Sequence, residues 1–259
     1  MIITNTRMKA AWLLVLLGIL VTPLVVRAQS ATIDILRLAD GRPDLQGTWD
    51  FRTITPMQRP ESLAGIEVLN EEELEAFEAA ENVRRDRDNF TDTTTTGDYN
   101  QFWYDRGTEL LDDGRTSLIT DPPNGRIPEL TEAAQARNEA RREAARLAEG
   151  VEVRPLSERC IMGFNSGPPM TPSAYNNNVQ LVQTENYMLI HNEMVHNVRP
   201  VKLNTSAHRE VPRKWEGDSI GHWEGDTLVV ETNHFARATS FGNSSENMHL
   251  LEKFWLIEA

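Results

Sequence analysis

Beyond residue 178 apolar positions alternate with polar ones, which is the pattern of half-buried β-strands. The alternation predicts strands over Val179–Thr184 and Tyr187–Met194, joined by a two-residue hairpin loop at Glu185-Asn186, where asparagine tolerates a positive φ. A third strand is expected over Val195–Leu203, in which Pro200 favours a sheet edge or a bulge because proline has no N–H to donate.

The tetrapeptide Trp-Glu-Gly-Asp occurs twice, at 215–218 and at 223–226, and each copy fits a hairpin turn. The two turns would leave a short strand, Ser219–Trp223, between them. The clearest remaining strands are Thr227–Thr232 and His249–Ile257. No helical pattern separates these strands, so they predict an antiparallel meander and not alternating βαβ units.

Helical patterns belong to the first half of the chain. Asn70 and Glu73 form a capping box before a helix that is expected to end near Arg87. A second helix is expected from Thr131 to about Glu149, with Gly150 as the residue that ends it. Its inner stripe consists mainly of alanines, which bury little area, so this helix is expected on the surface of the protein.

Two short strands complete the expected elements, Thr48–Ile54 and Thr116–Ile119. The fold class predicted from these patterns is mainly β with helical additions. An antiparallel meander is expected to form a sheet or barrel, with two surface helices in the N-terminal half.

The N-terminus has the pattern of a secretory signal peptide. Arg7 and Lys9 precede an apolar run over residues 10–26, and Val26-Arg27-Ala28 provides a cleavage site. A membrane span needs about 20 apolar residues, and this run is shorter and contains Pro23. We therefore expect cleavage of residues 1–28 near Ala28, a periplasmic or secreted product, and no membrane insertion of the mature chain.

The mature chain is expected to form one domain. Residues 29–174 would supply extended segments and two helices packed on the barrel, and residues 175–259 would supply the meander. The sequence gives no indication of the oligomeric state.

Composition narrows the possible partners. The chain has 259 residues with 26 Lys+Arg against 39 Asp+Glu, a formal net charge of −13. Nucleic acid is not an expected partner, because binding to phosphates requires a basic surface. The single cysteine, Cys160, excludes an internal disulfide framework and multi-cysteine metal sites. A small-molecule ligand is the partner that we expect.

The stretch His191–His196 is the main catalytic candidate. On a strand His191 and Glu193 would share one face, and His196 would join them only across a bulge. A neutral imidazole beside a carboxylate suits proton transfer or a divalent metal. The alternative is that these residues lie on the solvated face of the sheet. No cofactor is expected, and the sequence does not decide whether a divalent metal binds.

A second set combines aromatic rings with amide and carboxylate groups, as a pocket for a polar small molecule does. The predicted ligand-binding residues are Trp215, Trp223, Tyr175, Asn177, Glu224 and Asn233. The alternative is that the tryptophans anchor turns to the core and the asparagines cap a loop.

Several stretches resemble a family of secreted bacterial proteins. They are Pro43–Trp49, Arg115–Pro128 with D-P-P-N-G-R-I-P, Tyr175–Gln183, Glu193–His196, and Trp223–Asn233 with W-E-G-D-T-L-V-V-E-T. The resemblance covers most of the mature chain but implies no reaction and gives no role to any residue. Because such proteins normally continue through further strands and another cysteine, it implies that this chain is truncated at the C-terminus.

Gly47-Thr48-Trp49 also resembles the G-x-W that opens lipocalin-type barrels, in which the tryptophan closes the barrel floor. Together with the meander, this resemblance implies a lipocalin-like barrel. The expected function is a secreted or periplasmic β-barrel that binds a small organic or sugar-like ligand. The alternative is a secreted hydrolase or lyase that uses His/Glu acid–base chemistry.

Overall fold

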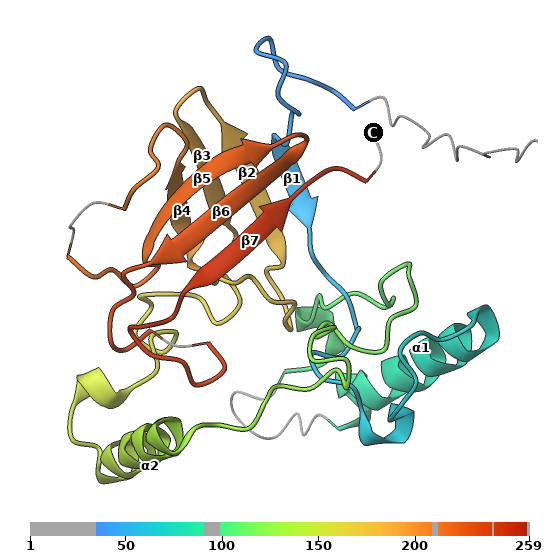
Figure 1. Cartoon of the computed structure of the whole chain (residues 1–259). Helices are drawn as coiled ribbons and strands as arrows, with labels where there is room; N and C mark the ends of the chain where they lie inside the picture. The colour runs from blue at the N-terminus through green and yellow to red at the C-terminus, as the bar shows by residue number, and fades with distance from the viewer. Residues whose placement is uncertain (1–34, 91–98, 209–211, 240, 258–259) are drawn as a thin grey trace, which may run out of the picture. The chain divides into compact units, whose positions relative to one another are not determined.

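A single curled sheet of seven strands, β1 to β7 in chain order, dominates the computed structural model (Figure 1). Its strands are β1 (Gly47–Asp50), β2 (Asn178–Gln183), β3 (Tyr187–Asn192), β4 (Val198–Lys202), β5 (Asp218–Glu224), β6 (Thr227–Asn233) and β7 (Leu250–Phe254). Within the described chain no strand pairs with the outer edge of β1 or of β7, so the sheet is a half-barrel. The predicted mainly-β fold with helical additions is confirmed, as an open sheet and not a closed barrel.

The structure describes residues 35–90, 99–208, 212–239 and 241–257. The predicted signal peptide and its cleavage site near Ala28 lie outside these residues. None of the helices in the described ranges has both the length and the apolar character required to cross a membrane.

The main core lies on one face of the sheet, where alternate residues of β2, β3, β4 and β6 meet and Trp223 of β5 and Phe254 of β7 pack against them. Its buried members are Leu45, Val179, Leu181, Met188, Ile190, Val201, Leu228 and Val230. Trp49 is paired with Val179, and residues paired directly across two strands point to the same face. Trp49 therefore faces the core side of β1, at the margin of the half-barrel.

The two hairpins follow the alternation closely. Gln183 pairs with Met188, so Glu185-Asn186 forms the tip of the β2–β3 hairpin as predicted. Glu224 pairs with Thr227, so the second Trp-Glu-Gly-Asp copy forms the tip of the β5–β6 hairpin.

The predicted uniform antiparallel meander is wrong at one place, because β4 and β5 are parallel. The first Trp-Glu-Gly-Asp copy does not join two antiparallel strands and instead ends a long connection into β5. Pro200 pairs only with β3, and the pairing of β4 with β5 begins at Val201, after the residue that has no N–H.

The two copies of the tetrapeptide give a matched test of this topology. Both Gly217 and Gly225 have a positive φ, 74° and 61°, but a Cβ at 217 would lie 2.5 Å from the Asn233 carbonyl oxygen and one at 225 would meet nothing. We expect Gly217→Ala to cost about 3–4 kcal/mol of unfolding free energy, the sum of left-handed strain and overpacking. Gly225→Ala should cost about 1 kcal/mol. Urea denaturation measures both variants, and equal losses would contradict the placement of the first copy.

Two α-helices lie in the first half, α1 (Glu71–Arg85) and α2 (Glu132–Leu147). The capping box is present, with the Glu73 N–H donating to Asn70 Oδ1 at 3.0 Å and the Asn70 N–H donating to Glu73 Oε2 at 3.0 Å. The end of α2 differs from the prediction, because Ala148 and not Gly150 takes the left-handed conformation, at φ 52°.

The apolar stripe of α1, Leu74 and Phe77, packs on a small second core of Ile54, Leu69 and Leu110. Five short 3₁₀-helices complete the elements of the described chain: Glu61–Leu63, Arg87–Asn89, Gln101–Trp103, Val151–Val153 and Met194–His196.

The predicted strand Thr116–Ile119 is wrong. Thr116 Oγ1 donates to the Ile66 carbonyl oxygen at 2.6 Å, and Ser117 Oγ donates to the Ile119 carbonyl oxygen at 2.7 Å. Side-chain bonds of this kind compete with the ladder of a strand.

Candidate functional site

The three predicted catalytic residues do not lie on one strand. His191 is on β3, where its Nδ1 lies 3.5 Å from Gln180 Oε1, while Glu193 follows the strand and accepts a bond from Asn178 Nδ2 at 2.9 Å. The predicted continuation of β3 to Met194 is wrong, because Val195 and His196 have positive φ values of 58° and 41° and the chain turns through a 3₁₀-helix. Glu193 and His196 are both exposed.

The six predicted ligand-binding residues are dispersed. Trp223 packs against the main core, and Trp215 lies in the turn before β5 with its carbonyl oxygen bound by Thr239 Oγ1 at 2.7 Å. Glu224 is exposed and pairs with His222 at 3.2 Å. Asn233, at the end of β6, contacts His234.

Asn177 and Tyr175 lie together in the segment before β2. Asn177 is buried, accepts from the Ser173 N–H at 2.8 Å and donates to the Asp105 carbonyl oxygen at 2.8 Å, so its amide holds backbone segments together. The Tyr175 ring makes an edge contact with Phe164, with centroids 5.6 Å apart.

Histidines and carboxylates do gather elsewhere, on the face of β5 and β6 that points away from the main core. Asp218, with its side chain 1% exposed, accepts bonds from Lys202 Nζ at 2.7 and 3.0 Å and lies 3.3 Å from His208 Nδ1. Glu231 lies 3.7 Å from His208 Nε2 and 2.8 Å from His249 Nε2.

This network fastens the long β4–β5 connection to the sheet. Burial raises the pKa of Asp218, but hydrogen bonds from Lys202 and His208 and the charges of Lys202 and Lys214 outweigh it and hold that pKa below its usual value. Hydrogen bonding and charge from His249 and His208 likewise lower the pKa of Glu231. No group of three or more His, Cys, Asp or Glu side chains in the described ranges is arranged to hold a metal ion.

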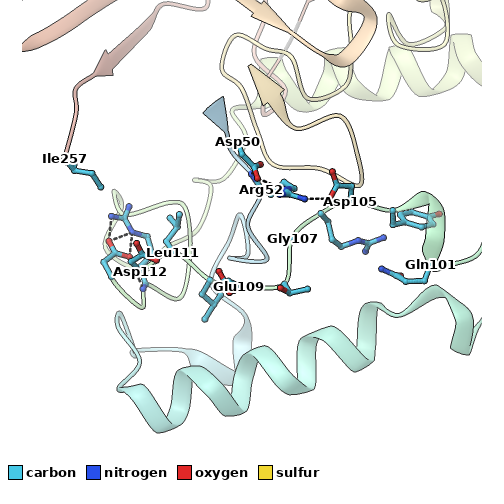
Figure 2. A pocket seen from close by; sticks show the side chains of 15 residues that line it. Asp50, Arg52, Gln101, Asp105, Gly107, Glu109, Leu111, Asp112 and Ile257 are labelled. Carbon is cyan, nitrogen blue, oxygen red and sulfur yellow. Dashed lines mark hydrogen bonds and ion pairs between the residues drawn. The ribbon is translucent and has the colours of Figure 1, made fainter. Parts of the chain in front are cut away.

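One hollow is polar, with a volume of about 640 Å³, and lies beside the segment from Gln101 to Arg115 (Figure 2). Arg52 extends between Asp50 and Asp105 and pairs with both, and Arg115 pairs with Asp113. These charges therefore neutralise one another within the wall of the hollow. The hollow supplies many hydrogen-bonding groups but no buried flat surface on which a ligand could be shielded from water.

A second hollow, of about 310 Å³, is apolar and lies at the open margin of the half-barrel. We call it the edge cleft, and it is lined by Leu45, Trp49, Met170, Val179, Leu181, Lys253, Phe254, Trp255, Leu256 and Ile257. Among these residues Lys253 alone is charged. The cleft thus brings the beginning of the described chain, β2 and the segment of β7 together.

Two tryptophans remain open to solvent in the edge cleft, Trp49 at 41% and Trp255 at 57% exposure. Trp49 Nε1 donates to the Leu45 carbonyl oxygen at 3.0 Å, which satisfies its polar atom and fixes the ring beside the core. The edge cleft and the polar hollow share Ile257. They use opposite faces of β1, because Trp49 lines the cleft, Asp50 lines the hollow, and successive residues of a strand point to opposite faces.

From the sequence Trp215 and Trp223 were predicted to bind a ligand, whereas Trp255, Met170 and Leu45, which line the edge cleft, were not singled out. The sequence feature that indicated one residue of the cleft is the G-x-W at Trp49, because its resemblance to lipocalins predicts an aromatic ring at the barrel floor. Comparisons with protein-family models, with curated proteins and with solved structures find no match.

Proposed function

We propose that the protein binds a small apolar organic molecule in the edge cleft. The observation that carries this proposal is the pair of exposed tryptophans, Trp49 and Trp255, in the wall of an apolar hollow of about 310 Å³. Ligand pockets are typically concave, mostly apolar and about 300–1,000 Å³ in volume. Exposed apolar surface that is gathered in one hollow commonly marks a binding site.

The chemistry of the lining favours an organic ligand over a sugar. A sugar requires several directional hydrogen bonds besides an aromatic plate. In the edge cleft the indole N–H of Trp49 is already bonded to Leu45, and the lining holds no amide or carboxylate side chain among the described residues.

A small molecule is also favoured over an added β-strand. The two edges that flank the cleft are short, with β1 spanning Gly47–Asp50 and β7 spanning Leu250–Phe254, and Lys253 lies on the latter. Short edge strands that carry lysine are features that discourage strand addition.

A neutral fluorescent probe, N-phenyl-1-naphthylamine, tests this proposal. We expect saturable binding of one probe per chain, and about tenfold weaker binding for Trp49→Ala and for Trp255→Ala, because each removes an aromatic wall. Met170→Trp should fill the cleft and weaken binding further.

Trp103→Ala is the matched control, since Trp103 is 61% exposed and lies outside the edge cleft. Equal losses for Trp103→Ala and the cleft variants, or binding that does not saturate, would overturn the proposal. Circular dichroism of each variant shows whether the fold is retained.

A further inference from the structure

Arg106 is an arginine that the described chain leaves without a counter-charge. Its guanidinium carbon lies 4.6 Å from the centroid of the Tyr104 ring, and its Nε is buried with no hydrogen-bond partner among the described residues. The adjacent carboxylate, Asp105, is paired with Arg52. A buried guanidinium N–H without an acceptor costs free energy unless something else satisfies it.

The neighbouring charges increase that cost. On α1 a single carboxylate, Glu81, pairs with both Arg84 and Arg85, at 2.5 and 2.6 Å. Burial and the positive charge of Arg85 lower the pKa of Arg106. Within the described chain Arg84 and Arg85 thus share one carboxylate and Arg106 is paired with none, in a protein whose net charge is −13.

A cavity of about 240 Å³ lies between Arg85 and Arg106, and no carboxylate lines it among the described residues. The hydroxyl hydrogens of its wall are already used. Thr53 Oγ1 donates to the Glu109 carbonyl oxygen, Thr55 Oγ1 therefore donates to Thr53 Oγ1 at 2.9 Å, and Ser173 Oγ donates to the Tyr175 carbonyl oxygen. The side-chain donors left for an occupant are therefore the guanidinium groups.

We propose that this cavity binds a small oxyanion of phosphate or sulfate size between Arg85 and Arg106. Arg85 uses Nε for Glu81 and Nη2 for the Ile54 carbonyl oxygen, which leaves Nη1 available for the occupant. The planar fork of a guanidinium matches two oxygens of an oxyanion, and two such forks hold it in one orientation. The anion satisfies the buried Nε of Arg106 and neutralises the excess charge.

Thermal unfolding of the full chain tests this site. Sodium phosphate and sodium sulfate are compared with sodium chloride at equal ionic strength in a zwitterionic buffer at neutral pH. We expect both oxyanions to raise the melting temperature above the chloride value, because a ligand that binds the native state stabilises it. Arg106→Gln should abolish that increment.

The change in melting temperature caused by Arg106→Gln in chloride distinguishes the proposal from a purely structural role of Arg106. In chloride Arg106→Gln should melt at the wild-type temperature or above it, because it removes a half-buried charge whose buried Nε has no acceptor among the described residues. Arg115→Gln, which changes an arginine that is paired with Asp113 outside the cavity, should keep the oxyanion increment.

Three results would overturn the proposal. The first is no stabilisation by phosphate or sulfate beyond chloride, and the second is an increment that Arg106→Gln retains. The third is a lower melting temperature of Arg106→Gln in chloride, which would show that a carboxylate of the protein already neutralises this arginine.

Discussion

Glu252→Gln is expected to lower the free energy of unfolding by about 3–5 kcal/mol, the typical cost of leaving one charge of a buried pair without its partner. Glu252 on β7 accepts two bonds from Arg199 on β4, at 2.5 and 2.9 Å, and the two side chains are 11% and 3% exposed. Arg199 Nη1 also donates to Thr232 Oγ1 at 3.3 Å, while its Nε has no partner among the described residues. The variant would therefore leave a guanidinium charge inside the half-barrel.

The surface pair Arg37–Asp226 is the matched control, because it has the same bonding geometry as the buried pair but is exposed to solvent. It has the same two-bond arrangement, at 2.8 and 2.8 Å, but its side chains are 42% and 56% exposed. Asp226→Asn should cost about 1 kcal/mol or less in urea denaturation, because exposed pairs are weakened by solvent. The double variant Arg199→Met/Glu252→Leu should recover most of the loss. If Glu252→Gln costs no more than Asp226→Asn, the buried pair does not exist as described.

Asp218→Asn is expected to cost about 3 kcal/mol at neutral pH, because Lys202 and Lys214 then lose their carboxylate and His208 keeps only Glu231. The loss of unfolding free energy caused by Asp218→Asn should become smaller as the pH falls. A lowered folded-state pKa means that the ionised form contributes stability above the ordinary pKa of about 4, and that this contribution is lost as pH falls through the folded value.

We therefore expect the difference between wild type and Asp218→Asn to be constant at neutral pH and to shrink as pH falls below about 4. Denaturation curves at several pH values measure this difference. Glu224→Gln, on the same strand but 57% exposed, should change stability by less than about 1 kcal/mol. A difference between Asp218→Asn and wild type that stays constant into acid would contradict the assigned role of the carboxylate.

The alternation of apolar and polar residues predicted most of the sheet. It located β2, β3 and β6 and their hairpins because one face of each strand is buried in the core, which leaves a period of two in the sequence. It also predicted α1 and its capping box, since both partners of the box are local.

Features formed by segments that lie far apart in the sequence could not be predicted from this local alternation. The parallel pairing of β4 with β5 depends on how the connection after Lys202 folds back, which no local pattern encodes. The edge cleft joins Trp49 to Trp255, and the buried pair joins Arg199 to Glu252, across more than fifty residues in each case. His191 and Glu193 were predicted on one strand, but β3 ends at Asn192, and a positive φ at Val195 turns the chain before His196.

The most direct measurement of ligand binding in the edge cleft is fluorine NMR of the chain labelled with 5-fluorotryptophan. The sequence contains six tryptophans, and single Trp→Phe variants assign their resonances. On titration with N-phenyl-1-naphthylamine, we expect the resonances of Trp49 and Trp255 to shift together and saturate, while those of Trp103 and Trp215 stay in place. Shifts at Trp103 or Trp215 with none at Trp49 and Trp255 would contradict it.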